Sequence, residues 1–135
     1  MKSSIFGIPV DERATEIVLE QIKKGLKARS VFTHVVSLNP ENLVVAKGDR
    51  EFRKIVTEAQ IRINDGIGTV LAVQILNGVK VPRLSGDDLM QQLVKWSSDE
   101  SLRVLLIGGK GKLAEGLADC YNRSYTASKF KGVEG

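Results

Sequence analysis

The chain has 135 residues, of which 42% are hydrophobic and 27% charged, and its net charge is +4. This length suits one ordinary domain that buries a core without disulfides or metals, and the composition excludes a disordered or fibrous protein. Lysines and arginines alternate with acids, and only 5% of residues are aromatic, which argues against a nucleic-acid partner.

The sequence also argues against secretion and membrane insertion. No segment approaches the roughly 20 apolar residues of a membrane span, and no basic segment followed by a long apolar run opens the chain. We therefore expect a cytoplasmic protein, with any membrane contact peripheral and at the inner face. The single cysteine, Cys120, suits a reducing compartment and is interpreted as a small buried residue. Whether the chain forms a homo-oligomer stays open.

Segments that predict strands alternate with segments that predict helices. The strands are expected at residues 5–10, 31–37, 61–64, 102–107 and 128–135. The helices are expected to begin after the N-cap Asp11, near Pro40, after the N-cap Asp49, and to cover Gly68 to Leu76, Gly86 to Trp96 and Lys112 to Tyr125. This alternation predicts one α/β domain over residues 1–135, with a doubly wound, Rossmann-like, mostly parallel sheet and helices on both faces.

Burial can also be predicted for several of these segments. The run 102–107 is almost continuously apolar, which is typical of a central parallel strand covered on both faces. The helix from Gly68 to Leu76 is apolar enough to be largely buried, and Gly78 is expected to end it. His34, in the middle of its strand, is interpreted as a core or near-core residue, and Trp96 as a core residue.

Three short polar signatures stand where apolar segments end. They are Ser37-Leu38-Asn39, Asp65-Gly66-Ile67-Gly68 and Arg83-Leu84-Ser85-Gly86-Asp87-Asp88-Leu89. In an open α/β sheet the loops after the strands meet at one edge. We therefore expect these distant groups to converge on one ligand.

In order and spacing, the three signatures resemble the WecG/TagA/CpsF glycosyltransferases over almost the whole chain. That family usually has Thr-Pro-Asn, Asp-Gly-x-Gly and Arg-x-x-Gly-x-Asp-Leu at these places. The chain departs from the first pattern, with Ser37 for Thr and Leu38 for Pro, and Pro40 follows Asn39. The hydroxyl and the amide are kept, while the loop geometry and the donor specificity are put in question.

The resemblance implies an inverting transferase. It moves an N-acetylmannosamine-type sugar from UDP onto a polyprenyl diphosphate-linked sugar, in the synthesis of cell-surface polysaccharide or teichoic acid. No cofactor is expected, and in place of the metal-binding Asp-x-Asp pair of many nucleotide-sugar transferases the chain has only the adjacent Asp87-Asp88. Members of the family continue beyond the length of this chain with further strands, helices and a membrane-associating tail. We therefore expect a C-terminally truncated chain that lacks any site residues from the later part.

Asp65 and Arg83 are the candidate catalytic residues. A carboxylate at a strand end can remove the proton of the attacking hydroxyl, and the resemblance gives Asp65 this role. A guanidinium can hold two phosphate oxygens and offset the charge of departing UDP, which suits Arg83. The structural alternatives are a turn or helix cap at Asp65 and a salt bridge from Arg83 to Asp87 or Asp88.

The candidate substrate-binding residues come from the ends of the same segments. Ser37 and Asn39 can hydrogen-bond to a sugar or diphosphate, or can cap a helix instead. Gly66 and Gly68 allow a ligand to approach the backbone closely. Gly86 and Asp88 are also candidates, although their main expected role is to open and cap the helix that follows.

A glycine-rich loop follows the strand predicted at residues 102–107. Gly108, Gly109 and Gly111 open the next helix, whose free N–H groups can bind a diphosphate. Read from Gly109, the loop also matches the G-x-G-x-x-A form of the dinucleotide fingerprint, with Glu134 where a ribose-binding acid would fall. An NAD-binding oxidoreductase module is therefore one alternative, and a noncatalytic binding domain is another. The chain has one His and one Cys, so no metal site is indicated.

Overall fold

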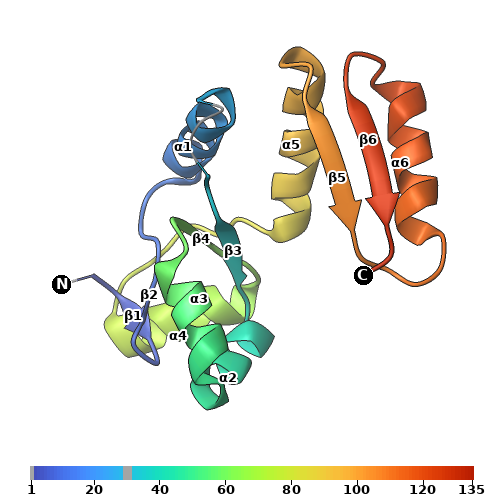
Figure 1. Cartoon of the computed structure of the whole chain (residues 1–135). Coiled ribbons are helices and arrows are strands. Elements are labelled where there is room, and N and C mark those ends of the chain that lie inside the picture. Colours follow the sequence, from blue (N-terminus) through green and yellow to red (C-terminus); the bar gives the residue numbers. More distant parts are fainter. Residues whose placement is uncertain (1, 29–31) are drawn as a thin grey trace. The chain divides into compact units, whose positions relative to one another are not determined.

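The computed structural model describes residues 2–28 and 32–135 and divides the chain into two compact units, Met1–Leu89 and Met90–Gly135. Within the described residues it has six helices and three two-stranded sheets, two of them parallel (Figure 1). The predicted mixed α/β class is confirmed. A single doubly wound, Rossmann-like sheet is not confirmed.

The first unit opens with a hairpin where a single strand was expected. Strands β1 (Ser4–Ile5) and β2 (Ile8–Pro9) pair antiparallel, so the prediction of one strand over residues 5–10 was wrong. Phe6 and Gly7 form the turn with φ of 52° and 76°, and two positive values in a two-residue loop are typical of a type I′ turn. The reversal buries both Ile5 and Ile8.

Helix α1 (Thr15–Lys27) begins later than expected, and Asp11 does not cap it. Its N-cap residue is Ala14, which makes no side-chain cap bond. The Asp11 carboxylate instead accepts from the backbone N–H of Arg13 at 3.0 Å and from its Nε at 2.8 Å. The prediction of an Asp11 cap was wrong because the nearby guanidinium binds this carboxylate.

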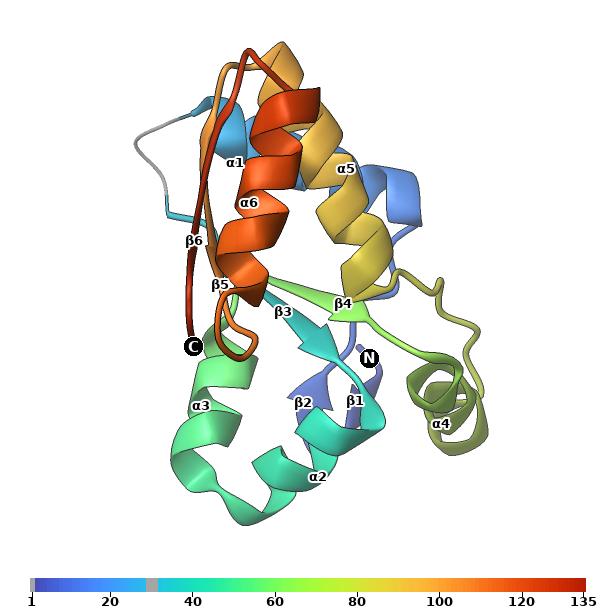
Figure 2. The same cartoon turned by 90° about the vertical axis from the view of Figure 1, so that its right-hand side faces the viewer.

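Strands β3 (Val35–Leu38) and β4 (Ile61–Asn64) form the parallel pair of the first unit, with Leu38 opposite Asn64. Figure 2 shows the chain continuing from their ends into α2 and α4. His34 is half-buried and precedes β3, so its predicted place within the strand was wrong. Val31, where that strand was expected to begin, lies outside the described residues.

Helices α2 (Pro40–Gly48) and α3 (Arg50–Glu58) begin where the sequence predicted. The side chain of Asp49 caps α3 by accepting from the N–H groups of Glu51 and Phe52. These helices, the hairpin and one face of the sheet share a core. Its buried members are Ile5, Ile8, Val10, Leu38, Leu43, Ala46, Val56, Val73 and Val81.

Helix α4 (Ile67–Asn77) is far more exposed than its composition suggested. Only Thr69 and Val73 are buried on it, while exposed fractions reach 80% at Ile75. The other exposed apolar side chains of the helix are Ile67, Leu71 and Leu76. The prediction of a largely buried helix was wrong, whereas Gly78 ends the helix in the left-handed conformation as expected.

The second unit is a βαβ arrangement. Helix α5 (Gly86–Asp99) begins in the first unit and continues into the second. It is followed by β5 (Arg103–Ile107), α6 (Leu113–Ser124) and β6 (Lys129–Val133), and the two strands pair in parallel. Its core contains Val94, Ala118 and Phe130, with Val104 and Leu106 packed against them. Phe130 lies on β6 and Val94 on α5, so the two helices meet the sheet through this cluster.

Three burial predictions in the second unit need correction. Leu105 and Ile107 are 54% and 70% exposed, so β5 is not covered on both faces. Cys120 is exposed rather than buried. Trp96 is only half-buried, so its prediction as a core residue was wrong. Among the described residues, no helix is long and apolar enough to cross a membrane.

Candidate functional site

The first two signatures lie side by side because the strands they follow are paired. Leu38 stands opposite Asn64 in the parallel register, and the backbone N–H of Asp65 donates to the Leu38 carbonyl at 3.0 Å. Parallel strands end at the same edge of a sheet. The pairing therefore brings the Asp65 carboxylate to the edge that also carries Ser37.

Gly86, at the start of α5, adds the third signature to this edge. A Cβ placed on Gly86 would lie 3.2 Å from Ser37 Oγ and 3.5 Å from Asp65 Oδ2. Ser37 and Asp65 are both half-buried. The structure thus brings together one residue from each of the three signatures, and a side chain at position 86 would crowd both the Ser37 hydroxyl and the Asp65 carboxylate.

The Asp65 carboxylate does not cap the helix that follows it. The N-cap of α4 is Gly66, with φ of 81° and no side-chain cap bond. Gly68 approaches α2 so closely that a Cβ there would lie 2.8 Å from Pro40 Cγ. The buried hydroxyl of Thr69 donates to the Leu38 carbonyl at 2.8 Å. These contacts fix the start of α4 against the first signature.

Asn39 performs the capping role that was its structural alternative. Its Oδ1 accepts from the Asn42 N–H at 2.7 Å, at the start of α2. The Asn42 side chain in turn donates to the Ser37 carbonyl at 2.9 Å. This pair of bonds holds the first signature in place, and a ligand-binding role for Asn39 stays a prediction.

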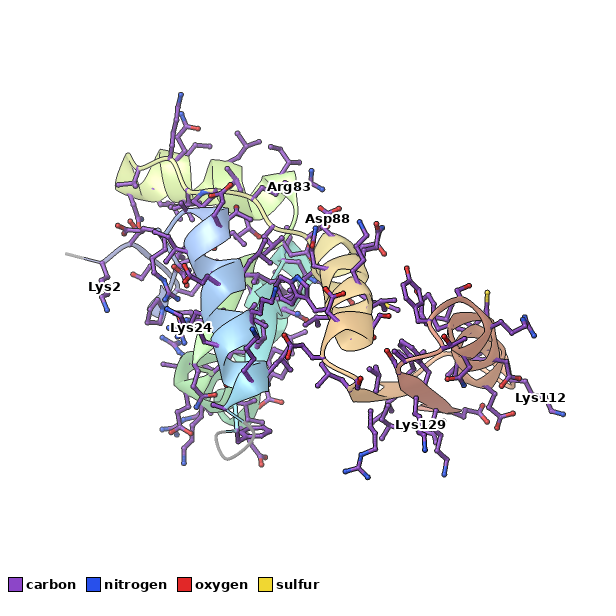
Figure 3. All side chains as sticks on the ribbon, turned by 90° about the horizontal axis from the view of Figure 1, so that it is seen from above. Lys2, Lys24, Arg83, Asp88, Lys112 and Lys129 are labelled. Carbon is purple, nitrogen blue, oxygen red and sulfur yellow. The ribbon has the colours of Figure 1, made fainter. Side chains whose placement is uncertain are left out.

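Arg83 lies on the segment that joins α4 to α5, and Asp88 lies in the first turn of α5 (Figure 3). Asp88 accepts from the Ser85 hydroxyl at 2.6 Å, and that hydroxyl accepts from the Asp88 N–H at 3.1 Å. This reciprocal pair caps the helix. The Asp88 carboxylate is therefore bound by Ser85 and not by Arg83, which was one of the predicted alternatives. Arg83 is exposed.

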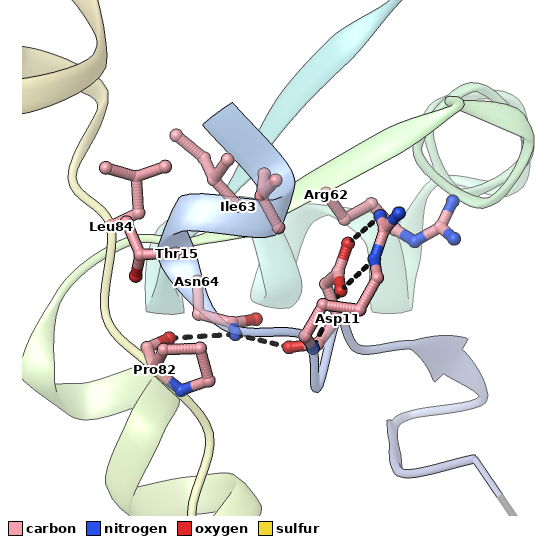
Figure 4. Close-up of a pocket in the computed structure, with 9 residues that line it drawn as sticks. Asp11, Thr15, Arg62, Ile63, Asn64, Pro82 and Leu84 are labelled. Carbon is pink, nitrogen blue, oxygen red and sulfur yellow. Dashed lines mark hydrogen bonds and ion pairs between the residues drawn. The ribbon is translucent and has the colours of Figure 1, made fainter. Parts of the chain in front are cut away.

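A small polar cluster behind the site was not predicted from the sequence. It contains Asn64, Asp11 and Arg13, and Figure 4 shows Asn64 between Asp11 and Pro82. Burial would raise the pKa of Asp11, but the hydrogen bonds from Arg13 outweigh it and lower the pKa of this carboxyl. The same contacts raise the pKa of Arg13. The only sequence signal for this cluster is an asparagine directly before Asp65-Gly66.

The glycine loop of the second unit connects β5 to α6. Gly108, Gly109 and Gly111 have φ of 133°, 76° and 62°, values that side chains disfavour. The Gly111 N–H donates to Glu134 Oε1 at 3.1 Å. Glu134 directly follows β6, so the loop and this acid are close, as the dinucleotide alternative required.

In the part of the chain that the structure describes, no group of three or more His, Cys, Asp or Glu side chains could hold a metal ion. The side chains of the candidate site are the Asp65 carboxylate, the Ser37 hydroxyl, the Asn39 amide and the exposed Arg83 guanidinium. Such a set can take up a proton and hydrogen-bond to a polar ligand.

Comparison with known proteins gives the family. The model of the Glycosyl transferase WecG/TagA/CpsF family matches residues 3–135. The chain belongs to this family of glycosyltransferases. The predicted resemblance is confirmed over both units, and the matched range includes all three signatures and the glycine loop.

A curated relative from Bacillus subtilis (strain 168) is named N-acetylglucosaminyldiphosphoundecaprenol N-acetyl-beta-D-mannosaminyltransferase. It is 22% identical to the chain over 129 residues, which are 96% of this chain and 50% of the relative. The chain thus spans about half the length of this relative. The name says that the relative transfers N-acetylmannosamine to a lipid-linked N-acetylglucosamine.

Proposed function

We propose that the chain carries the catalytic base of an inverting glycosyltransferase that uses a UDP-linked, N-acetylmannosamine-type donor. The acceptor would be a polyprenyl diphosphate-linked sugar, at the inner face of the cell membrane. The observation that supports this most is the meeting of Ser37, Asp65 and Gly86 at one sheet edge. Membership of the family and the name of the Bacillus subtilis relative supply the class of substrate.

The reaction assigns one task to each candidate group. The Asp65 carboxylate removes the proton of the acceptor hydroxyl, and the oxygen of that hydroxyl forms a bond to C1 of the donor sugar. The bond between C1 and the β-phosphate oxygen breaks, and its electron pair leaves with UDP. The proton remains on Asp65, and the Arg83 guanidinium offsets the charge on the departing phosphate.

The positions of these groups agree with these tasks. Asp65 is half-buried, so part of the residue remains accessible to an acceptor hydroxyl. The Ser37 hydroxyl and the Asp65 carboxylate both lie close to Gly86, and the hydroxyl can orient a sugar hydroxyl. Arg83 is exposed on a neighbouring segment, so its guanidinium can turn toward a phosphate without first breaking an ion pair with Asp88.

For the second unit, we propose that the glycine loop binds a nucleotide diphosphate through its backbone. Gly109 and Gly111 present N–H groups beside the start of α6, where the helix dipole favours an anion, whereas the Gly108 N–H donates to the Val133 carbonyl at 3.1 Å. The Glu134 carboxylate accepts from one of these N–H groups. This bond supports the assignment, because it marks the loop as a place where an anionic oxygen is accommodated.

A test of the proposal is transfer from UDP-N-acetylmannosamine to a lipid-linked N-acetylglucosamine, followed by release of UDP. We expect transfer that is lost on Asp65→Asn and kept on Asp49→Asn, which makes the same change of charge at the N-cap of α3, where asparagine still accepts the capping bonds. A chain that binds UDP but never releases it from the donor would instead be the noncatalytic binding domain. Binding of NAD would favour the oxidoreductase alternative, for which the position of Glu134 is the supporting observation.

A further inference from the structure

Asn64, the last residue of β4, connects three parts of the first unit. Its side chain is nearly fully buried, with 3% of the residue exposed. The Nδ2 group donates to the Asp11 carbonyl at 2.7 Å and to the Pro82 carbonyl at 3.1 Å (Figure 4). The backbone carbonyl of Asn64 accepts from the Leu84 N–H at 3.1 Å.

The residues bound by Asn64 lie on both sides of Arg83. Pro82 is held through its carbonyl and Leu84 through its N–H, so the backbone of Arg83 is fixed at both ends. The residue after Asn64 is Asp65, which is itself held by its N–H bond to Leu38. One buried residue therefore connects the two candidate catalytic segments.

We propose that Asn64 is a positioning residue that fixes the Arg83 backbone relative to the Asp65 carboxylate. The proposal rests on the function proposed above, because Asn64 affects catalysis only if Arg83 offsets the charge on the departing UDP. Asn64 itself need not touch the substrate. Its role is to restrict the backbone conformation around Arg83, so that the guanidinium is directed toward the phosphate of the leaving group.

An amide is the only small side chain that makes these bonds. Both acceptors are carbonyl oxygens, so the atom between them must carry two hydrogens, as the Nδ2 of asparagine does. The Oδ1 of Asn64 is buried and has no hydrogen-bond partner among the described residues. Turning the amide around would place this oxygen against two carbonyl oxygens, so the contacts define its orientation. An aspartate at this position would repel both carbonyls.

A purely structural role for Asn64 predicts a different behaviour, and Asn77 is the matched control. Asn77 also joins distant backbone, since its Oδ1 accepts from the Ser4 N–H at 2.7 Å and its Nδ2 donates to the Ser4 carbonyl at 3.3 Å. These bonds connect α4 to β1 and do not involve the residues beside Arg83. If Asn64 acted only on stability, the two asparagines would behave alike.

The first arm of the test is amide hydrogen exchange of the full 135-residue chain. We expect Asn64→Asp to speed exchange of the Leu84 amide about tenfold or more, while the amide of Ala59 at the end of α3 is unchanged. Asn77→Asp should leave Leu84 unchanged. If Asn64→Asp does not fold, Asn64→Ser, which keeps one donor, gives the same comparison with a smaller effect.

The second arm is a double-mutant cycle on the turnover number for UDP release. We expect Asn64→Asp to lower the turnover number about tenfold in the native background. The loss should be less than about twofold when Arg83 is already alanine, because Asn64 then has no guanidinium to position. Asn77→Asp should have the same small effect in both backgrounds.

Equal losses in the two backgrounds, or an unchanged Leu84 amide in Asn64→Asp, would overturn the proposal. Failure of the proposed function gives a different result. In that case the native chain neither binds UDP nor releases it from the donor, while the exchange arm still decides whether Asn64 holds the Arg83 segment.

Discussion

The two units present candidate ligand-binding groups of different kinds. In the first unit these are side chains from three separate segments, namely Ser37 and Asp65, which both lie close to Gly86, and Arg83 on the segment before α5. In the second unit they are backbone N–H groups of one continuous loop, at Gly109 and Gly111. Side chains can exchange protons or carry charge, whereas backbone N–H groups can only bind.

The two units also differ in the contacts that hold their segments together. The first unit holds its segments with buried hydrogen bonds to backbone carbonyls, from Thr69 to Leu38 and from Asn64 to Pro82. The second unit depends on close contact between backbones, with Gly132 lying directly against α6. Substitutions should therefore affect chemistry in the first unit, and folding or nucleotide binding in the second.

The strongest test of this contrast is Asp65→Asn. We expect transfer to fall by about a thousandfold, because the amide cannot accept the proton of the acceptor hydroxyl. UDP affinity should stay within about threefold of the native value, since asparagine is nearly isosteric with aspartate. Steady-state kinetics and calorimetry measure the two effects. A variant that keeps more than about a tenth of native transfer would exclude Asp65 as the base.

The largest effect on folding is expected from Gly132→Ala. The new Cβ would lie 2.1 Å from the carbonyl carbon and oxygen of Ala114, so α6 would have to move away from β6. We expect the free energy of unfolding to fall by about 3 kcal/mol in urea denaturation. Gly116→Ala is the control, because nothing lies within 4 Å of its Cβ and alanine favours a helix. An equal loss in both variants would contradict this account of the second unit.

Gly86→Val tests the close approach of Gly86 to Ser37 and Asp65 in the first unit. The branched side chain would enter the region between Ser37 Oγ and Asp65 Oδ2, and transfer should fall by about a hundredfold with the fold intact. Gly48→Val, at a position with nothing within 4 Å of the Cβ, should leave transfer nearly unchanged. Native transfer in Gly86→Val would show that the acceptor does not approach through this region.

The smallest expected effect concerns the pH dependence of stability. The pKa of Asp11 is lowered in the folded chain from its ordinary value of 3.8, chiefly by Arg13 acting against the effect of burial. A carboxyl with a lowered folded pKa stabilises the fold above its unfolded pKa, and this contribution is lost as the pH falls. Asp11→Asn should therefore lower stability by about 1 kcal/mol at pH 7.

The difference between the native chain and Asp11→Asn should shrink as the pH falls through 3.8 and below. Thermal unfolding of both proteins across this range measures it. A difference that stays constant with pH would mean that the Asp11 carboxylate is not stabilised by Arg13. Transfer should be little affected at neutral pH, because Asn64 bonds to the backbone carbonyl of Asp11 and not to its side chain.

Features determined by a few neighbouring residues could be predicted from the sequence. Asp49 caps α3 and Gly78 ends α4, as their residue types predict. The capping alternative for Asn39 is also observed. Each of these depends on bonds within about four residues, so the local pattern contains the needed information.

Features that depend on distant partners could not be predicted. The hairpin needs a positive φ at Phe6, which few side chains favour and no sequence pattern signals. The exposure of Ile75 and Ile107 depends on what packs against α4 and β5, not on their own apolar runs. The partners of the Asn64 amide lie 53 and 18 residues away, so its role emerges only from the folded structure.

The central claim is that the chain is part of a UDP-sugar transferase, and calorimetric titration of the purified chain with UDP and with NAD tests it most directly. The account predicts heat of binding for UDP and none for NAD. The same titration of Gly109→Val should show weaker UDP binding, since a side chain there would meet Leu113. Binding of NAD without binding of UDP would contradict the account and favour an oxidoreductase module.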